Sequence, residues 1–143
     1  MTATTTVDTR DPSKVYGLRM VPQLAPGMKM VGTVWAISAE TGVTTWKVEQ
    51  PAGMLSLAAT AGGLVFGGDA NGHFKAFDDR SGKVLWDVNV GSAVSGYPIS
   101  FAADGKQYVA VITGPSLVAN SNSRMMPNLM QGNAPNVFVF SLP

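Results

Sequence analysis

Hydrophobic and polar positions alternate in short runs along most of this chain. From Val31 onward, runs of β-branched and aromatic residues are separated by Gly, Asp, Asn and Ser at short spacing. Alternation with a period of two over four to eight residues is typical of β-strands. It predicts strands over residues 33–38, 44–49, 55–60, 64–69, 73–78, 84–89, 97–102, 107–113 and 136–142.

The remaining segments have no such pattern. Residues 1–30 are rich in Thr, Pro, Gly and Met and show no sustained period, so we expect an irregular segment there. Residues 118–136 are rich in Asn, Met and Pro, and we expect a long loop, either a surface excursion with packed methionines or a loop that carries a site. No segment predicts a helix. The chain is therefore predicted to be all-β.

One segment occurs twice without a gap. GTVWAISAETGVTTWKV begins at Gly32, and GHFKAFDDRSGKVLWDV begins 40 positions later. Gly42 aligns with Gly82 in a predicted hairpin turn, and Trp46 aligns with Trp86 in the strand that follows. A period of about 40 residues in a strand-rich chain is typical of the blades of a β-propeller, each a four-stranded antiparallel sheet.

The repeat also predicts how the chain is divided. Residues 55–89 give one complete four-stranded blade, and the next blade has three predicted strands. Closed propellers have about four to eight blades, whereas 143 residues give room for about three. We therefore predict an irregular segment over residues 1–30 and a partial β-propeller of about two to three blades over residues 31–143, with the last blade incomplete.

Composition excludes several classes of function. Charged residues make up 13% of the chain, the net charge is +1, and no run of Lys or Arg indicates a nucleic-acid partner. The absence of cysteine excludes disulfides and thiolate chemistry within these residues. The lone histidine, His73, fits a surface strand better than a catalytic triad or a metal site. The sequence shows no signal peptide and predicts no membrane span.

The repeated segments resemble a known family. The pattern A-x-D-x-x-T-G-x-x-x-W resembles the tryptophan-docking motif of quinoprotein dehydrogenases, and residues 36–46 and 76–86 are two copies of it. The second copy has Asp78 at the acidic position, where the first has Ser38. The stretch from Gly53 to Leu117 and the VFVFSLP sequence near the end resemble the carboxy-terminal blades of methanol and ethanol dehydrogenases that use pyrroloquinoline quinone (PQQ).

The resemblance implies a function for a larger protein. It implies an eight-bladed propeller in the periplasm that oxidises primary alcohols to aldehydes by hydride transfer to PQQ, beside a Ca²⁺ or lanthanide ion. It also implies a catalytic Asp as base and a cytochrome c as electron acceptor. The family's catalytic Asp, metal-binding Glu and Asn, vicinal Cys pair and ring-stacking Trp have no counterparts in this sequence. We therefore expect the lone chain to be inactive and to need the remaining blades or subunits.

The same resemblance implies two places that contact the quinone. Met54 falls where some members have a Trp at the cofactor rim, and plain core filling is the alternative reading of this residue. The second place falls where others have a Gly-Gly-Trp turn, and it consists of Thr113, Gly114, Pro115, Ser116 and Leu117. No catalytic residue and no metal ligand is predicted in this chain. A different function is a non-catalytic repeat module that assembles with other chains through open blade edges.

Overall fold

The computed structural model describes residues 2–5, 18–21, 23–129, 132 and 134–141. Antiparallel sheets dominate it, and a single short helix follows β10 in this part of the chain. The elements are β1 (Thr2–Thr5), β2 (Leu18–Val21), β3 (Gly32–Ile37), β4 (Thr44–Gln50), β5 (Met54–Ala59), β6 (Leu64–Asp69), β7 (His73–Asp78), β8 (Val84–Asn89), β9 (Ile99–Ala103), β10 (Lys106–Thr113), α1 (Leu117–Met125) and β11 (Asn136–Ser141).

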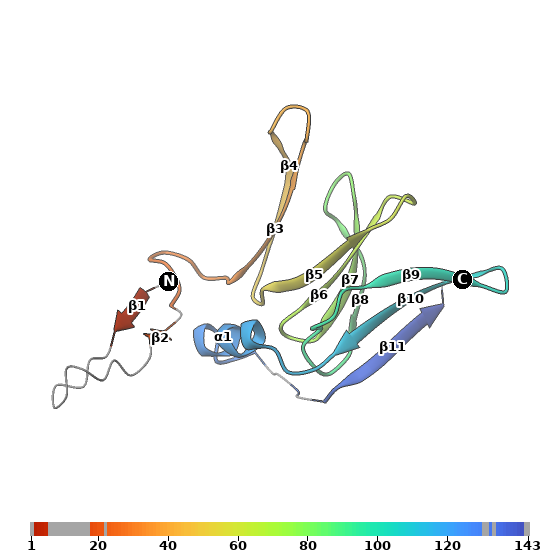
Figure 1. The fold of residues 1–143 in the computed structure, drawn as a ribbon. Helices are drawn as coiled ribbons and strands as arrows, with labels where there is room; N and C mark the ends of the chain where they lie inside the picture. Colours follow the sequence, from red (N-terminus) through yellow and green to blue (C-terminus); the bar gives the residue numbers. More distant parts are fainter. Residues whose placement is uncertain (1, 6–17, 22, 130–131, 133, 142–143) are drawn as a thin grey trace.

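The complete blade predicted from the repeat is present. Strands β5, β6, β7 and β8 form one antiparallel sheet in that order, and we call it blade 2. Its hairpins turn at positive-φ glycines, as at Gly63 and Gly82, because glycine has no Cβ to oppose that conformation. Strands β9, β10 and β11 form the next sheet, blade 3, and the β3–β4 hairpin before blade 2 is blade 1 (Figure 1). The prediction of a partial propeller with an incomplete last blade is confirmed for the described residues.

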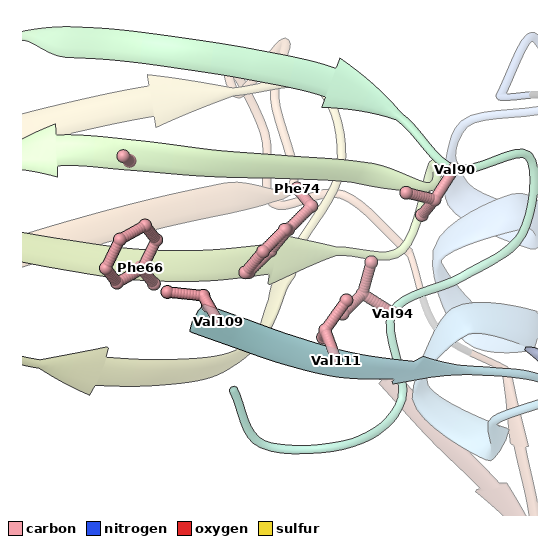
Figure 2. Close-up of a cluster of buried hydrophobic side chains, with 7 residues drawn as sticks. Phe66, Phe74, Val90, Val94, Val109 and Val111 are labelled. Atoms are coloured by element: carbon pink, nitrogen blue, oxygen red, sulfur yellow. The ribbon is translucent and has the colours of Figure 1, made fainter. Parts of the chain in front are cut away.

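Blades 2 and 3 share the main hydrophobic core. Alternate residues of β6 and β7 point toward blade 3, and alternate residues of β10 point back toward them (Figure 2). Phe74 and Val94 are fully buried, and Val109 and Val111 are 1% exposed. Phe138 and Phe140 of β11 pack on the same core. Burial of these faces between neighbouring sheets is what holds the blades together.

Trp46 of blade 1 docks on the turn of blade 2. Its indole N–H donates to the carbonyl oxygen of Asp79 at 2.7 Å. The ring lies against Gly82, where a Cβ would come within 2.6 Å of Trp46 Cε3. A fixed tryptophan in the last strand of one blade therefore requires a glycine in the turn of the next, which is the docking arrangement that the repeat predicts.

Two predictions made from the sequence are corrected. The prediction of no helix is wrong, because Leu117–Met125 forms α1, capped by the side chain of Ser116. In the segment predicted as irregular, β1 and β2 pair in antiparallel register, from Thr2 opposite Val21 to Thr5 opposite Leu18. Thr is common in strands, but neither TATT nor LRMV alternates strictly between apolar and polar residues, so the period of two is not seen there. Along the described residues, no helix is long and apolar enough to cross a membrane.

Candidate functional site

The loops at one end of blades 2 and 3 come together next to α1, and we call this the α1 end (Figure 1). It contains residues 51–54, 69–72, 90–94 and 113–116. Backbone hydrogen bonds join these loops in series: Ala70 N–H donates to Gly53, Val94 N–H to Asp69, and Gly114 N–H to Ala93. The loops meet at this end because the strands are antiparallel. Strands β5 and β7 begin at the same end of the sheets at which β6 and β10 finish.

Helix α1 closes this end with small side chains. Ala119 of the helix packs with Ala52, Ala70 and Ala93, all buried, in a cluster that Leu55 and Leu129 flank. The side chain of Asn122 is buried and accepts a hydrogen bond from Gly53 N–H at 2.6 Å. A Cβ on Gly53 would lie 2.8 Å from that same Oδ1 atom. The close approach of α1 therefore depends on small residues in the loops beneath it.

Met54 lies at the α1 end but points across its own blade. Its sulfur comes within 2.9 Å of the place that a Cβ on Gly67 would occupy, so the side chain covers the glycine of the neighbouring strand. Met54 is half-buried in this position. The geometry is that of a methionine filling a gap between strands, the alternative that the sequence left open. Its contact with a quinone stays a prediction.

The second segment predicted to contact the quinone, residues 113–117, forms an ordered turn and the start of α1. Thr113 is 1% exposed, and its hydroxyl donates to Ala134 O and accepts from Asn136 N–H. Gly114 is buried with φ of +152°, a backbone region that favours glycine. Ser116 caps α1, while Pro115 and Leu117 are exposed, Leu117 to 87%. Within this turn, Pro115 and Leu117 offer side chains to a ligand, and the polar groups of Thr113 serve the fold.

The structure also shows a buried polar network that the sequence did not reveal. Lys75 Nζ donates to Gln50 Oε1 at 3.0 Å and to Asp69 Oδ2 at 3.3 Å, and both members of the Lys75–Asp69 pair are at least 88% buried. The other oxygen of Asp69 accepts from the backbone N–H groups of Asn71 and His73, each at 2.9 Å. Gln50 belongs to blade 1, so the network joins two blades directly below the α1 end. No sequence spacing indicates it, because the three residues come from different strands.

His73, Asp87 and Asp78 are titratable groups outside this network. His73 Nδ1 is 2.7 Å from Asp87 Oδ1, and both side chains are more than 30% exposed. Asp78 accepts from the hydroxyl and the backbone N–H of Ser81, which hold the pKa of Asp78 below its ordinary value. Among the described residues, no three His, Asp or Glu side chains gather as a metal site would require.

The quinone and metal that the resemblance implies would need polar groups that are free to bind them. The hydroxyl of Thr113 is already paired inside the protein, and Met54 covers Gly67. Asp69, which belongs to this end, is buried and paired with Lys75. These residues do not fit a complete quinone or metal site. What they provide is an ordered surface of loops that forms at most one side of such a site.

Comparison with known proteins shows which proteins share this sequence and architecture. The family described as "PQQ: Glucose/ethanol/alcohol dehydrogenase, beta-propeller domain" matches residues 50–109. Quinoprotein ethanol dehydrogenase from Pseudomonas aeruginosa is 42% identical over 88 residues, which are 59% of this chain and 14% of that protein. Methanol dehydrogenase [cytochrome c] subunit 1 from Methylobacterium organophilum is 40% identical over 85 residues, again 59% of this chain and 14% of that protein.

A solved structure agrees with the sequence matches. A europium-containing methanol dehydrogenase superposes with a TM-score of 0.70 and 29% identity, covering 81% of this chain and 24% of the other. The chain thus spans about one seventh of the length of the curated relatives it matches. The matched residues include blade 2, with its docking turn, and the start of blade 3. Residues 50–109 therefore match a portion of the β-propeller of the PQQ-dependent alcohol dehydrogenases, and the described blades are similar to that portion in fold.

Proposed function

We propose that residues 32–141 form consecutive blades of a PQQ-dependent alcohol dehydrogenase, with the α1 end as part of the rim around the quinone. The observation that carries the proposal is Trp46 docked on Gly82, which joins two consecutive blades, the second of them within the family match. The α1 end gathers both predicted contact places, Met54 and residues 113–117, on one side of the sheets. That shared location supports a rim position for them.

The proposed activity belongs to the whole propeller. It is the oxidation of primary alcohols to aldehydes with PQQ as hydride acceptor, with Ca²⁺ or a lanthanide ion bound beside the quinone. A europium-containing methanol dehydrogenase among the structural neighbours supports a lanthanide. A relative named for cytochrome c supports a cytochrome as electron acceptor. We also propose a periplasmic location, on the strength of the resemblance to this group of enzymes.

The lone chain is proposed to have no turnover. The resemblance gives this chain no counterpart of the catalytic Asp or of the metal ligands, and its own loops supply at most one side of a cofactor site. The test is alcohol oxidation by the purified chain with PQQ, Ca²⁺ or a lanthanide, and an artificial electron acceptor. We expect the rate to equal that of the same mixture without protein. A rate that depends on both PQQ and the chain would contradict the proposal.

Transplanting these blades into a related enzyme tests whether they form part of a PQQ-dependent alcohol dehydrogenase. In the Pseudomonas aeruginosa quinoprotein ethanol dehydrogenase, the segment that matches this chain is replaced by residues 32–141. We expect the folded chimera to bind PQQ and to oxidise alcohol, because blades dock through repeated contacts that the host also needs. A control chimera lacking the host's catalytic base shows the background rate. A folded chimera that binds no PQQ would overturn the proposal.

A substitution at Met54 tests whether this residue lies at the rim around the quinone. In the chimera, Met54→Trp restores the residue that the resemblance associates with the cofactor rim. We expect a change of at least about tenfold in PQQ affinity, which corresponds to about 1.4 kcal/mol. Val43→Trp is the matched control, since Val43 is 63% exposed and lies in the turn between β3 and β4, outside the α1 end. Equal PQQ affinities in all three proteins would remove Met54 from the rim.

A second function is favoured by one observation. In the described part of the chain, β11 pairs with β10 alone, which leaves its other edge open. Such edges are templates for strand pairing. The alternative proposal is a non-catalytic module that assembles with other chains through this edge. Analytical ultracentrifugation distinguishes it: a monodisperse monomer over a wide concentration range, alone and with candidate partners, would count against assembly.

A further inference from the structure

The methionines of this chain are concentrated outside the predicted strands. Apart from Met54, every one of them lies in residues 1–30 or 118–136. The structure brings parts of these two segments together, because residues 23–31 pass beside the carboxy-terminal end of α1 (Figure 1). A groove of about 300 Å³ lies between them, and we call it the methionine groove. The proposed function gives this groove no role.

The segment on one side of the methionine groove is held in place by two backbone hydrogen bonds. Met28 N–H donates to Ala25 O at 3.0 Å, and the φ of Gly27 within this turn is +82°. A glycine with positive φ at the third position is typical of a type II turn. At the end of the segment, Val31 N–H donates to Pro51 O at 3.4 Å. The turn and the anchor together fix the course of the chain along the groove.

Three methionines line the methionine groove. Met28 and Met30 come from this segment and are 51% and 38% exposed. Met125, the last residue of α1, comes from the other side and is half-buried. The described residues that line the groove are Gln23, Leu24, Ala25, Met28, Met30, Val31 and Met125. Three thioether groups, drawn from segments that are distant in sequence, therefore share one small space.

The chemistry of these walls favours a soft cation. Of the described residues that line the groove, none is charged. Lys29 lines a neighbouring hollow together with Glu49 instead. Helix α1 ends at Met125, and the carboxy-terminal end of a helix carries partial negative charge. Thioether sulfur is a soft, neutral ligand that selects Cu⁺. Hard cations such as Ca²⁺ need oxygen ligands, which these methionines do not supply.

We propose that Met28, Met30 and Met125 bind one Cu⁺ ion through their three thioether sulfurs. Binding forms metal–sulfur bonds only and transfers no electron or proton. The apolar side chains of Leu24 and Val31 beside the sulfurs favour an ion that is weakly hydrated. This site lies outside the blades, uses none of the residues predicted to contact the quinone, and goes beyond the proposed function.

Silver ion is the probe, because Ag⁺ has the charge and softness of Cu⁺ and is stable in air. The full 143-residue chain is labelled with ¹³C at the methionine methyl groups and titrated with Ag⁺. We expect saturable 1:1 binding that shifts the methyl resonances of Met28, Met30 and Met125 and leaves that of Met54 in place. The same titration with Ca²⁺ should shift none of them. Competition for Cu⁺ with a chromophoric chelator, without oxygen, then measures the affinity for the proposed ion.

Leucine variants show which sulfurs bind the ion. Leu has nearly the volume of Met but has no sulfur. We expect Met28→Leu and Met125→Leu each to weaken Ag⁺ and Cu⁺ binding at least about tenfold. Met126→Leu is the matched control, since Met126 is the next residue and does not line the groove; its binding should be unchanged. Circular dichroism checks that each variant is folded.

The outcomes separate this proposal from the proposed function. Absence of saturable Ag⁺ or Cu⁺ binding would overturn it, as would equal loss in the Met126→Leu variant. Shifts of the same resonances by Ca²⁺ would also overturn it, because they would show a site without preference for soft ions. The assay contains no quinone or alcohol, so its failure leaves the blade transplantation untouched, and the reverse also holds.

Discussion

Gly42 and Gly82 occupy identical turns in different surroundings. Their φ angles are +69° and +70°, and each donates its N–H to the residue four positions earlier, at 2.8 and 2.9 Å. A Cβ on Gly42 would meet nothing within 4 Å, whereas one on Gly82 would press on Trp46. The two positions therefore separate the cost of backbone strain from the cost of a lost docking contact.

We predict that Gly82→Ala destabilises the chain more than Gly42→Ala. Both substitutions place a Cβ in left-handed backbone, which costs about 1–2 kcal/mol. Gly82→Ala adds overpacking against the indole, which costs about 1–3 kcal/mol. Urea unfolding followed by circular dichroism measures both variants. Equal losses would mean that Trp46 moves aside freely and that docking contributes little.

Asp78 gives a prediction for pH. Its pKa is lowered in the folded chain by hydrogen bonds from Ser81, so the stabilisation is present above the unfolded pKa, about 3.9, and is lost as the pH falls through the folded value. Asp78→Asn should be less stable than the parent at neutral pH, and the difference should shrink in acid. Urea midpoints from about pH 7 to about pH 2.5 measure it.

Ser38 supplies the matched control for that experiment. It holds the position of Asp78 in the first repeat and accepts from Thr41 N–H at 3.3 Å through a hydroxyl that does not titrate. Ser38→Ala should therefore change stability by the same amount at every pH. A pH-independent effect of Asp78→Asn would contradict the assignment of its lowered pKa to ionised hydrogen bonding.

At the scale of elements, strands from Gly32 onward were predictable and the helix was not. The strands from β3 to β11 are short runs rich in β-branched, aromatic and other apolar residues, with turn residues between many of them, so local sequence predicts them. The sequence of α1, LVANSNSRM, has no apolar stripe at helical spacing. Its stability comes from Ala119 and Asn122, which contact loops that are distant in sequence, up to 69 residues away. Such contacts leave no local periodicity.

Asn122→Ala tests that account of α1. The substitution leaves the partly buried N–H of Gly53 without its partner, which costs about 1–3 kcal/mol. We expect faster hydrogen exchange of the Gly53 amide and of α1, with blade 2 unaffected. Asn120→Ala is the matched control, because Asn120 is an exposed residue of the same helix. Equal exchange in both variants would show that the helix holds its place without this bond.

Breaking the buried Lys75–Asp69 pair should destabilise the chain more than breaking the exposed His73–Asp87 pair. Lys75→Met leaves the buried carboxylate of Asp69 without its cation, and breaking a buried pair in this way costs about 3–5 kcal/mol. Asp87→Asn breaks the exposed pair with His73 and should cost about 0–1 kcal/mol. Thermal and urea unfolding measure both. If Lys75→Met were as mild as Asp87→Asn, the network would not join blade 1 to blade 2.

The candidate site was only partly predictable. The family pattern pointed to Met54 and residues 113–117, and topology brings them to the same end of the sheets. Sequence could not show that the hydroxyl of Thr113 is used within the fold, since its partners lie beyond a long insertion. Nor could it pair Gln50 with Lys75, because the register between two blades depends on tertiary packing.

At the scale of the whole molecule, the described stack presents two apolar outer faces. On β3, Trp35 and Ile37 are 53% and 59% exposed. On β11, Val137 and Val139 are 67% and 55% exposed, while Phe138 and Phe140 between and beside them pack inward. These are the surfaces that neighbouring blades cover in a propeller.

We predict that the pure chain associates as its concentration rises, because both faces are apolar. The double variant Val137→Lys and Val139→Lys should reduce this association without loss of stability, since both side chains already lie in solvent. Sedimentation velocity across a concentration series measures the effect. Unfolding by urea provides the check that the variant is folded. Unchanged association in a folded variant would remove the β11 face as its cause.

The two faces differ, and this decides the geometry of any self-contact between them. Joining the β3 face of one copy to the β11 face of the next is a heterologous contact, which leaves one free face of each kind at the ends. Assembly of that sort continues by addition of copies. It stops only if the rotation from copy to copy closes a ring, and otherwise it gives filaments of no fixed length.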